Sequence, residues 1–587
     1  MTETPTILKL KIDRFRGIQA LDWNPSSGMN IVLGGGDAGK TTILDAIALL
    51  LSPSNSLVLS EADYWQRKVE DEFVIQAVVA LPASSEIGQQ RKFAWPWEWN
   101  GSDALPPTGD EADDGRGASG QPVYRLQVRG TAELEIAWDI VQPNDDTDHL
   151  SAAVRRNIGV VRLGGDDRND RDLRLVYGSA LDRLLADKGL RARIGQRVSD
   201  IDLAANLGDE ARKALEELDK TLKTEALPTG LDLGLTSSQG LSIGALIGLM
   251  ADRAPGVSLP LASWGAGTRR MTALQIAAAS EAESSITVID EIERGLEPYR
   301  QRKLVRSQQE RGAQSFVTTH SAVAINAADQ ASLWYLDGTG QIGGLPREKI
   351  ARQQERDPET FLSRFAIIAE GPTELGLLSY LMERAIDGGF ADHGVRVCDG
   401  QGNPATLDLL EALAGGGLTF GGFADDEGQA SGRWSALKAK MGDRLFQWTN
   451  GCTEESIIGL VPDDRLVELI AHDDTGVSAE RRLTLASRLG IGDRSLEAIQ
   501  AATDDFRALL IAAATGSRDG APDDETAKLW VRHGRRWFKS EAGGRELAAK
   551  MLALGVWPAL KPELMPFFNA IRSALGQGPL ADIAHDG

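Results

Sequence analysis

Residues 34–41 spell GGGDAGKT, and this stretch decides the fold of the chain around it. It fits the pattern Gly-x4-Gly-Lys-Thr, follows the apolar run MNIVL at 29–33 and precedes the helically spaced run TTILDAIALLL at 41–51. A strand, glycine loop and helix in this order cradle phosphate oxygens, because glycine lets backbone N–H groups point at the anion and the helix N-terminus favours negative charge. The stretch therefore predicts an ATP site in preference to a glycine-rich turn that matches by chance.

The side chains of this loop have predictable tasks. Lys40 would reach the β and γ phosphates, and the Thr41 hydroxyl would hold Mg²⁺. Further along, the apolar run ITVI at 286–289 ends in two acids. We expect Asp290 to bind Mg²⁺ through water and Glu291 to polarise the attacking water. The predicted nucleotide-binding residues are Gly34, Gly36, Gly39, Lys40, Thr41, Thr42, Asp290 and His320, the last at the end of the run FVTTH.

This order of motifs resembles the ATPase heads of the ABC and SMC type, which include recombination and repair ATPases. LKLKIDRFRG at 8–17 is similar to their first strand, ERGLEP at 293–298 to the loop after their acidic strand, and His320 to their switch histidine. In that family two heads clamp ATP between one phosphate loop and the partner's signature segment. WGAGTRR at 264–270 resembles this segment but lacks its usual serine, since Ser263 lies slightly early.

A second acidic motif lies at residues 365–374, FAIIAEGPTE. Its buried strand would deliver Glu370 at the carboxyl end, Gly371 would allow a tight turn, and Glu374 would face the same mouth one helical turn on. Two more strand–helix units follow, and the second, LTFGGFADDEG at 418–428, brings in Asp425. In a parallel sheet these acids would converge and would need Mg²⁺ or Mn²⁺ for two-metal phosphodiester cleavage. Spacing alone leaves unrelated surface acids as an open alternative.

The Glu-Gly-x-x-Glu segment and the later Asp-x-acid resemble a TOPRIM domain, and an ABC-type head followed by TOPRIM resembles the overcoming-lysogenization-defect (OLD) family of ATP-dependent nucleases. The resemblance implies metal ligation by Glu370, Glu374 and Asp425, with Glu427 where such proteins often carry Asp. It adds Glu455 as a ligand for the second metal and Lys539 as a lysine that stabilises charge on the phosphate. Two alternatives remain open. Glu455 could be an exposed acid at a helix start, and Lys539 could contact the DNA backbone or belong to a solvated basic face.

The implied function is an ATP-regulated, metal-dependent DNA endonuclease, with Glu370, Asp425, Lys539 and Glu291 as its catalytic residues, in phage defence or DNA processing. The alternative is an SMC-like ATPase clamp or sensor whose TOPRIM domain binds DNA without cutting. A topoisomerase is disfavoured, because it needs a tyrosine nucleophile and the last tyrosine, Tyr380, lies on an apolar helix pattern. The head domain gives no support for a primase. Partners implied are DNA, a second copy of the chain and a helicase or other defence-system protein.

The predicted fold class is α/β, with an ABC-type head that carries an antiparallel side lobe and a helical insert, followed by a TOPRIM domain with a helical C-terminal part. Expected boundaries are 1–165 and 231–355 for the head, 166–230 for the insert, and 362–587 for the TOPRIM part. The insert is either a dimerising arm or a solvated helical pair.

Composition narrows the setting. The net charge of −22 argues against a broad nucleic-acid-coating surface but leaves room for a local basic groove. Only two cysteines, Cys398 and Cys452, occur in 587 residues, which suits a reducing cytosol and argues against structural zinc. With neither a signal peptide pattern nor an apolar run of about 18 residues, we expect a cytoplasmic protein without a membrane span.

Overall fold

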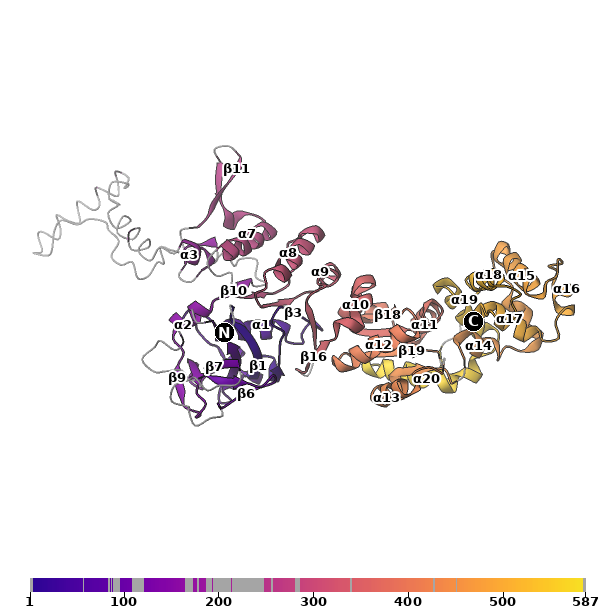
Figure 1. The fold of residues 1–587 in the computed structure, drawn as a ribbon, viewed down its shortest axis with the longest axis horizontal. Coiled ribbons are helices and arrows are strands. Elements are labelled where there is room, and N and C mark those ends of the chain that lie inside the picture. The colour runs from indigo at the N-terminus through magenta and orange to yellow at the C-terminus, as the bar shows by residue number, and fades with distance from the viewer. Residues whose placement is uncertain are drawn as a thin grey trace, which may run out of the picture. The chain divides into compact units, whose positions relative to one another are not determined.

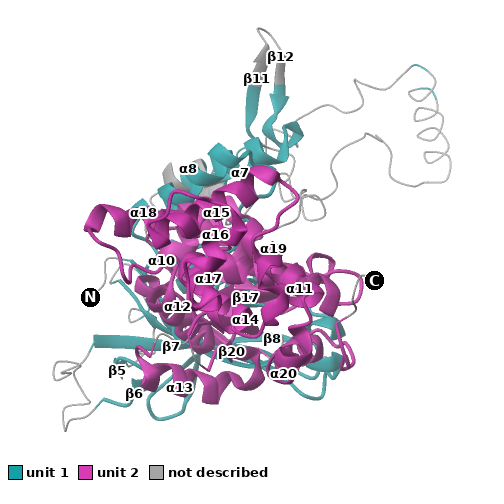
Figure 2. Ribbon diagram, turned by 90° about the vertical axis from the view of Figure 1, so that its right-hand side faces the viewer, with its two compact units in different colours: residues 1–30, 41–319 teal, residues 31–40, 320–587 magenta. Residues whose placement is uncertain are grey.

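The chain was analysed as a computed structural model that carries side chains. Two compact units divide it: unit 1 comprises residues 1–30 and 41–319, and unit 2 comprises residues 31–40 and 320–587 (Figure 2). The division after Thr319 precedes the expected boundary near residue 355, so the last strands of the expected head fall in unit 2. The structure describes residues 4–55, 57–82, 85, 87, 96–107, 121–163, 173–176, 179–185, 193, 209, 213, 248–254, 257–279, 285–337, 340–425, 428–449 and 451–583.

Unit 1 contains the predicted antiparallel lobe, an eight-stranded sheet. Its strands run in the order β2-β1-β4-β7-β5-β6, with β8 on β7 and β9 on β8. In β1, Leu10, Ile12 and Phe15 are buried and Asp13 and Arg14 are exposed, which fits a sheet with one face on a core, and the register shifts near Ile7. The strands are β1 Thr6–Phe15, β2 Ile18–Trp23, β4 Phe73–Ala80, β5 Trp97–Trp99, β6 Ala104–Leu105, β7 Gln121–Gly130, β8 Ile136–Val141 and β9 Thr147–His149.

A parallel ladder in unit 1 is formed by β10 (Val160–Leu163), β13 (Ile286–Ile289) and β14 (Ser315–Thr318). All four residues of β13 and of β14 are buried, which explains their continuous apolar sequence. Strand β3 (Met29–Gly34) starts beside β14, where the Asn30 side chain donates to the Ser315 carbonyl at 3.4 Å. The described part of the unit also contains the helices α1 (Lys40–Leu50), α2 (Ala152–Ile158), α3 (Ala180–Leu185), α7 (Ala266–Ala279) and α8 (Pro298–Glu310) and the hairpin β11–β12 (Met250–Ala254, Val257–Pro260).

The predicted helical insert lies largely outside the described residues, and its role as a dimerising arm stays a prediction. Within residues 166–230 the structure describes α3 and a few neighbouring positions.

Unit 2 is built on a parallel sheet in the order β18-β17-β19-β20. Strands β17 (Phe365–Ala369) and β19 (Phe420–Ala424) are completely buried. Helices alternate with these strands, as the sequence predicts, and further helices follow β20, of which α19 packs against α11 and α20 against β20 (orange to yellow in Figure 1). The other strands are β15 Ser332–Leu336, β16 Ile342–Leu345, β18 Val395–Asp399 and β20 Leu445–Gln447.

The helices of unit 2 are α9 Ala322–Ala327, α10 Arg347–Arg356, α11 Pro372–Ala385, α12 Asn403–Gly415, α13 Ser431–Met441, α14 Thr453–Ile458, α15 Thr475–Leu489, α16 Leu496–Ala501, α17 Phe506–Thr515, α18 Asp524–Gly534, α19 Glu541–Ala553 and α20 Trp557–Ala574.

Helices α11 and α19 touch backbone to backbone. A Cβ built on Gly376 would lie 1.9 Å from the Glu541 carbonyl oxygen, and one on Gly544 would lie 2.1 Å from the Thr373 carbonyl oxygen. Only glycine fits at either position, so this crossing fixes the start of α19 against the first turn of α11. No helix in the described part of the chain is long and apolar enough to cross a membrane.

Candidate functional site

The phosphate loop follows β3 and leads into α1, as its sequence predicts. Two features of position 34 require glycine: its φ is +147°, and a Cβ there would lie 2.3 Å from the Leu336 carbonyl oxygen. Lys40, at the start of α1, is 5% exposed, and its ammonium donates to the carbonyls of Gly34 at 3.0 Å and Gly35 at 2.6 Å. The Lys40 ammonium therefore lies inside the phosphate loop, where it would contact the phosphate oxygens of a bound nucleotide.

Thr41, the next residue, contacts the acid at the end of β13. Its hydroxyl lies 3.2 and 3.3 Å from the two carboxylate oxygens of Asp290. The Thr318 hydroxyl donates to Asp290 at 2.6 Å and accepts from the Glu291 backbone N–H at 2.9 Å. A threonine hydroxyl beside an aspartate is the oxygen donor set that Mg²⁺ takes in phosphate-loop ATPases, so the residues fit this ion. Thr318 is a positioning residue that the sequence did not single out.

Glu291 stands in a strained conformation, as its φ of +50° is in the left-handed region. Its carboxylate pairs with Arg294 at 3.2 Å. Strain of this kind persists where the surrounding structure enforces it, and it is concentrated at functional sites. The role of Glu291 in polarising water stays a prediction.

Two arginines near the loop were not chosen as site residues. Arg16, in the RFRG segment after β1, has a φ of +48° and forms ion pairs with Asp45 on α1 and, at 2.9 Å, with Asp63. Arg162 pairs with the second oxygen of Asp45. Asp45 of α1 thus binds two arginines close to the phosphate loop, and the RFRG segment was the sequence signal for the first of them.

The signature-like segment packs within its own chain. A Cβ on Gly267 would lie 2.2 Å from the Gly295 carbonyl oxygen, in the predicted loop after the acidic strand. The buried Arg270 donates to the Asp290 carbonyl, and burial lowers its pKa. Ser263 lies before α7 and donates to Pro260 at 2.7 Å.

The second predicted site comes together at the carboxyl edge of the sheet in unit 2. Glu370, after β17, is 6% exposed, and Glu374, in the first turn of α11, is 5% exposed. Asp425 follows β19, and its backbone N–H donates to Glu370 Oε2 at 2.9 Å. Asn403, at the start of α12, donates to the same oxygen at 3.0 Å. The three acids that the sequence predicted are therefore neighbours, although the strands that bring them are up to 55 residues apart.

A fourth acid joins them, and it is Glu454 rather than the predicted Glu455. Glu454 is 1% exposed, and its Oε1 lies 3.0 Å from the Thr373 hydroxyl. Glu455 is exposed and caps its own helix by accepting from the Cys452 N–H at 3.1 Å. In the first turn of α14 (Thr453–Ile458), the Glu455 side chain folds back to the N-terminal end of the helix, whereas the Glu454 side chain is buried. Glu455 therefore does not join the cluster. Glu427 lies outside the described residues.

Lys539 reaches this carboxylate cluster, which we define as Glu370, Glu374, Asp425 and Glu454. Its ammonium lies 3.8 Å from Glu454 Oε1. Burial alone would lower the pKa of Lys539, but Glu454 and the other nearby acids outweigh it, so the pKa is raised. Sequence reasoning chose Lys539 and found three of the four acids; it missed Glu454 and the polar residues Thr373, Asn403 and Thr453 that hold them.

The acids of the cluster destabilise one another's charge. Burial, followed by the charges of Asp425 and Glu454, raises the pKa of Glu374 to about 8. Burial and the charges of Glu370 and Glu454 raise the pKa of Asp425 to about 7, although Thr453 donates to its Oδ1 from both backbone and hydroxyl, at 3.0 and 3.1 Å. One lysine does not balance four acids. A hard divalent cation fits the chemistry of such a donor set, yet in the described residues no three acidic, histidine or cysteine side chains are arranged to hold a metal ion.

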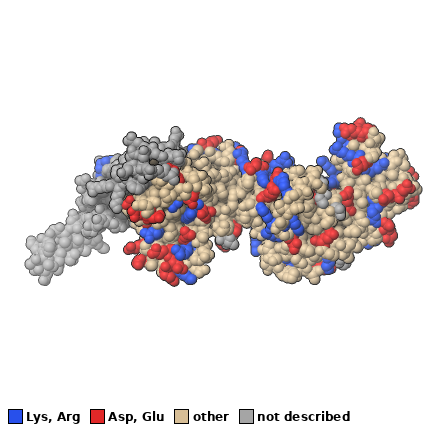
Figure 3. Space-filling view, turned by 60° about the horizontal axis from the view of Figure 1, so that its bottom comes forward, with Lys and Arg blue, Asp and Glu red and all other residues tan. Residues whose placement is uncertain are grey.

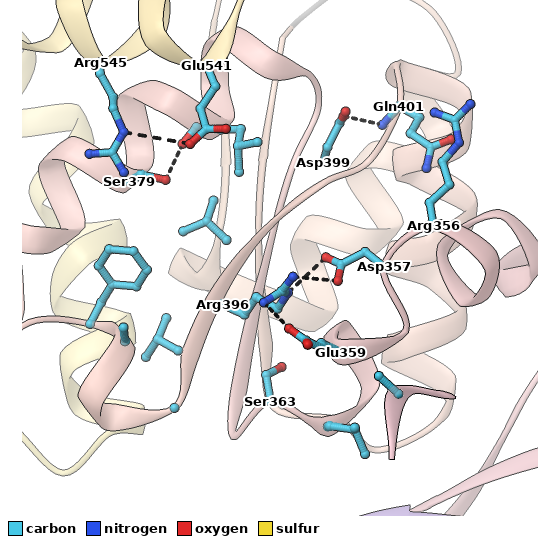
Figure 4. Close-up of a pocket in the computed structure, with 18 of the residues that line it drawn as sticks. Arg356, Asp357, Glu359, Ser363, Ser379, Arg396, Asp399, Gln401, Glu541 and Arg545 are labelled. Atoms are coloured by element: carbon cyan, nitrogen blue, oxygen red, sulfur yellow. Dashed lines mark hydrogen bonds and ion pairs between the residues drawn. The ribbon is translucent and has the colours of Figure 1, made fainter. Parts of the chain in front are cut away.

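A cavity of about 880 Å³ opens along the edge strand β18 of unit 2 (Figure 4). Arg396 bridges Asp357 at 2.8 Å and Glu359 at 2.6 Å inside it. Asp399, at the end of β18, accepts from the Gln401 N–H at 2.8 Å. The exposed His320 also lines this cavity; its role as a switch histidine for ATP stays a prediction.

Comparison with known proteins identifies an AAA-type domain in the segment that contains the phosphate loop. The AAA_21 family model, described as "AAA domain, putative AbiEii toxin, Type IV TA system", matches residues 29–326, slightly more than half of the chain. The match begins at the first residue of β3 and ends in α9, so it contains the phosphate loop, Asp290 and His320. The chain belongs to this AAA-domain family, and it is an ATPase by class.

The DNA replication and repair protein RecF of Shewanella sp. (strain MR-4) is 34% identical over 91 residues, which are 15% of this chain and 24% of RecF. RecF of Shewanella oneidensis is 33% identical over the same length. The matched segment thus covers about a quarter of these relatives.

Similar solved structures include an Smc head bound to the C-winged helix domain of ScpA, at 15% identity and a TM-score of 0.35, covering 59% of this chain and 99% of that one. RecF with ATP is similar at 13% identity and a TM-score of 0.32, covering 58% of this chain and 99% of that one.

Proposed function

We propose that this ATPase is also a divalent-metal-dependent DNA endonuclease, which cuts at the carboxylate cluster of unit 2 under control of ATP. The observation that carries the proposal is a cluster of four acids at one edge of a parallel sheet, with Glu370, Glu374 and Glu454 buried and Asp425 half-buried, and with Lys539 beside them. Burying several carboxylates together costs stability, and apolar residues of the same volume would be cheaper. Such an arrangement is a marker of chemistry rather than of folding.

The proposed roles follow from position. Glu370, Glu374 and Asp425 would hold Mg²⁺ or Mn²⁺, which would neutralise their charge and activate water. Asn403 and Thr453 keep two of these carboxylates in place through hydrogen bonds of 3.0 Å. Lys539 would stabilise charge that develops on the phosphate, and the observed 3.8 Å contact with Glu454 keeps it at the cluster.

Support for DNA as the substrate comes from the sequence resemblance to OLD nucleases and from the RecF relatives, which are named for DNA replication and repair. A role in phage defence or DNA processing, and action as a dimer, belong to the same proposal.

One observation favours the second candidate, an ATPase clamp that binds DNA without cutting. The described acids do not form a group ready to hold a metal. Under this alternative the cluster would only line a DNA-binding surface.

Plasmid nicking separates the two candidates. Purified full-length protein is mixed with supercoiled plasmid and Mg²⁺ or Mn²⁺, and open-circular product is measured. We expect nicking that EDTA abolishes and that both Glu370→Gln and Asp425→Asn reduce by at least about 100-fold. Glu455→Gln is the matched control, because this exposed neighbour lies outside the cluster, and it should nick at the wild-type rate. Nicking that survives Glu370→Gln and Asp425→Asn would refute the proposal, and binding without any nicking would favour the clamp.

A further inference from the structure

The segment from Trp530 to Lys539 alternates between anchored and exposed side chains. Trp530, His533, Trp537 and Phe538 are at most 5% exposed. Three exposed arginines lie between these buried residues, and the partly exposed Lys539 follows them. We call these cations, Arg532, Arg535, Arg536 and Lys539, the basic turn.

The backbone of the basic turn is held by buried contacts. Arg481, 1% exposed, forms a two-pronged ion pair with Glu546 at 2.6 and 2.7 Å. The same guanidinium donates to the carbonyls of Arg536 at 3.3 Å and Trp537 at 3.4 Å. The backbone that carries the exposed cations is therefore fixed by buried contacts. A fixed backbone reduces the conformational entropy lost when the cations bind a partner.

The arginines of the basic turn are the cations that could bind an external anion. Arg532 and Arg535 have no side-chain ion pair or hydrogen bond to any residue that the structure describes, and the contact of Arg536 with Glu480 is long, at 3.6 Å. The chain as a whole has a net charge of −22, and on the face that Figure 3 shows the basic side chains lie among acidic ones. Arg532 and Arg535, which have no such partner among the described residues and stand within four positions of each other, are thus a local exception on an acidic protein.

The basic turn ends at the proposed active site. Lys539 contacts Glu454, and the carbonyl of its neighbour Phe538 lies 3.1 Å from the Thr373 hydroxyl on α11. Seven residues of extended chain span at most about 25 Å, so Arg532 lies within that distance of Lys539. Because Arg532 is in α18 and the following residues turn, the cations of the basic turn lie no farther apart than about seven phosphates along one strand of DNA.

We propose that the basic turn binds the phosphodiester backbone of the DNA strand that enters the carboxylate cluster, with Arg532, Arg535 and Arg536 on phosphates next to the one at Lys539. Arginine suits this task, because its planar group binds phosphate oxygens in pairs. The contact is with backbone phosphates and gives no base preference. The inference rests on the proposed function, since it names the surface that delivers the substrate of that site.

The test measures DNA binding by the full-length protein with Arg532→Gln/Arg535→Gln. The probe is a fluorescein-labelled duplex of about 30 base pairs in two unrelated sequences, in Ca²⁺, across a series of salt concentrations. Each lost phosphate contact lowers the slope of log K against log salt by about 0.9. We expect the slope to flatten by about 1.8 and the affinity to fall equally for both sequences.

The matched control is Lys440→Gln/Arg494→Gln, which removes the same charge at two exposed positions on α13 and before α16. ATP turnover and the melting temperature should stay at wild-type values in both variants. An unchanged slope in Arg532→Gln/Arg535→Gln, or an equal change in the control, would overturn the inference.

Plasmid nicking by the same preparations separates this inference from the proposed function. If the wild type nicks but the slope does not change, the basic turn alone is wrong. If the wild type binds with the expected change of slope but does not nick, the nuclease proposal fails and the basic turn stands as a DNA contact. Absence of DNA binding by the wild type would refute both.

Discussion

Replacing Gly376 by alanine should separate α19 from α11. The new methyl carbon would lie 1.9 Å from the Glu541 carbonyl oxygen, whereas ordinary contact begins at 3.4 Å, so the helices must part by about 1.5 Å. Forcing one carbon into a packed core costs about 1–3 kcal/mol, and the rigid backbone on both sides places this change at the upper end. For a unit of this size, 3 kcal/mol corresponds to a fall in melting temperature of about 6–12 °C.

The displacement should also reach the chemistry. Lys539 lies two residues before α19, so its 3.8 Å contact with Glu454 should lengthen and plasmid nicking should fall. Calorimetry or urea unfolding measures the first effect. Gly432→Ala is the matched control, because a Cβ there would meet nothing within 4 Å; it should leave stability unchanged or raise it by up to about 1 kcal/mol. Equal unfolding midpoints for Gly376→Ala and the wild type would show that the two helices are not held by this contact.

Three further outcomes are expected. Lys40→Ala should lower ATP turnover by about 100-fold or more without changing the melting temperature. If this variant still nicks plasmid, ATP hydrolysis regulates cleavage and does not take part in the cleavage reaction. Arg481→Met should destabilise the protein by about 3 kcal/mol in urea, since Glu546 keeps a half-buried charge without its main partner. The pKa of Glu546 is lowered, because Arg481 and Lys550 outweigh its burial; its stabilisation is complete above the ordinary pKa of about 4.5 and is lost as pH falls below it. The melting temperature should therefore fall less between pH 7 and 3 in Arg481→Met than in the wild type, and parallel curves would contradict this. Burial raises the pKa of Cys398 to about 12 and also raises that of Cys452, so a thiol reagent at pH 8 should label neither before unfolding; rapid labelling of the native protein would contradict it.

The phosphate loop and the buried strands were predictable because their signals are local. The glycines, Lys40 and Thr41 stand together in the sequence, and the apolar runs of β13, β14, β17 and β19 are short and continuous. The rule that parallel strands end at one edge was then enough to bring Glu370 near Asp425.

Other parts of the site depend on tertiary contacts that leave no local pattern. Glu454 and Glu455 are adjacent in the sequence, and the rotation of α14 about its axis determines which of them faces the cluster. This rotation is set by packing against other elements, which the local sequence does not show. Asn403 carries no charge and stands on a different strand–helix unit from the carboxylate that it holds. The crossing of α11 and α19 pairs two glycines, Gly376 and Gly544, that are 168 positions apart in the sequence.

The carboxylate cluster has a consequence for how this chain can evolve. At neutral pH the raised pKa of Glu374 means that folding works against its charge, so a neutral Gln at this position should make the domain more stable. Random mutation and selection for stability alone would therefore erode the cluster. The cluster is thus a place where this chain gives up stability, as expected if these acids serve the proposed metal chemistry.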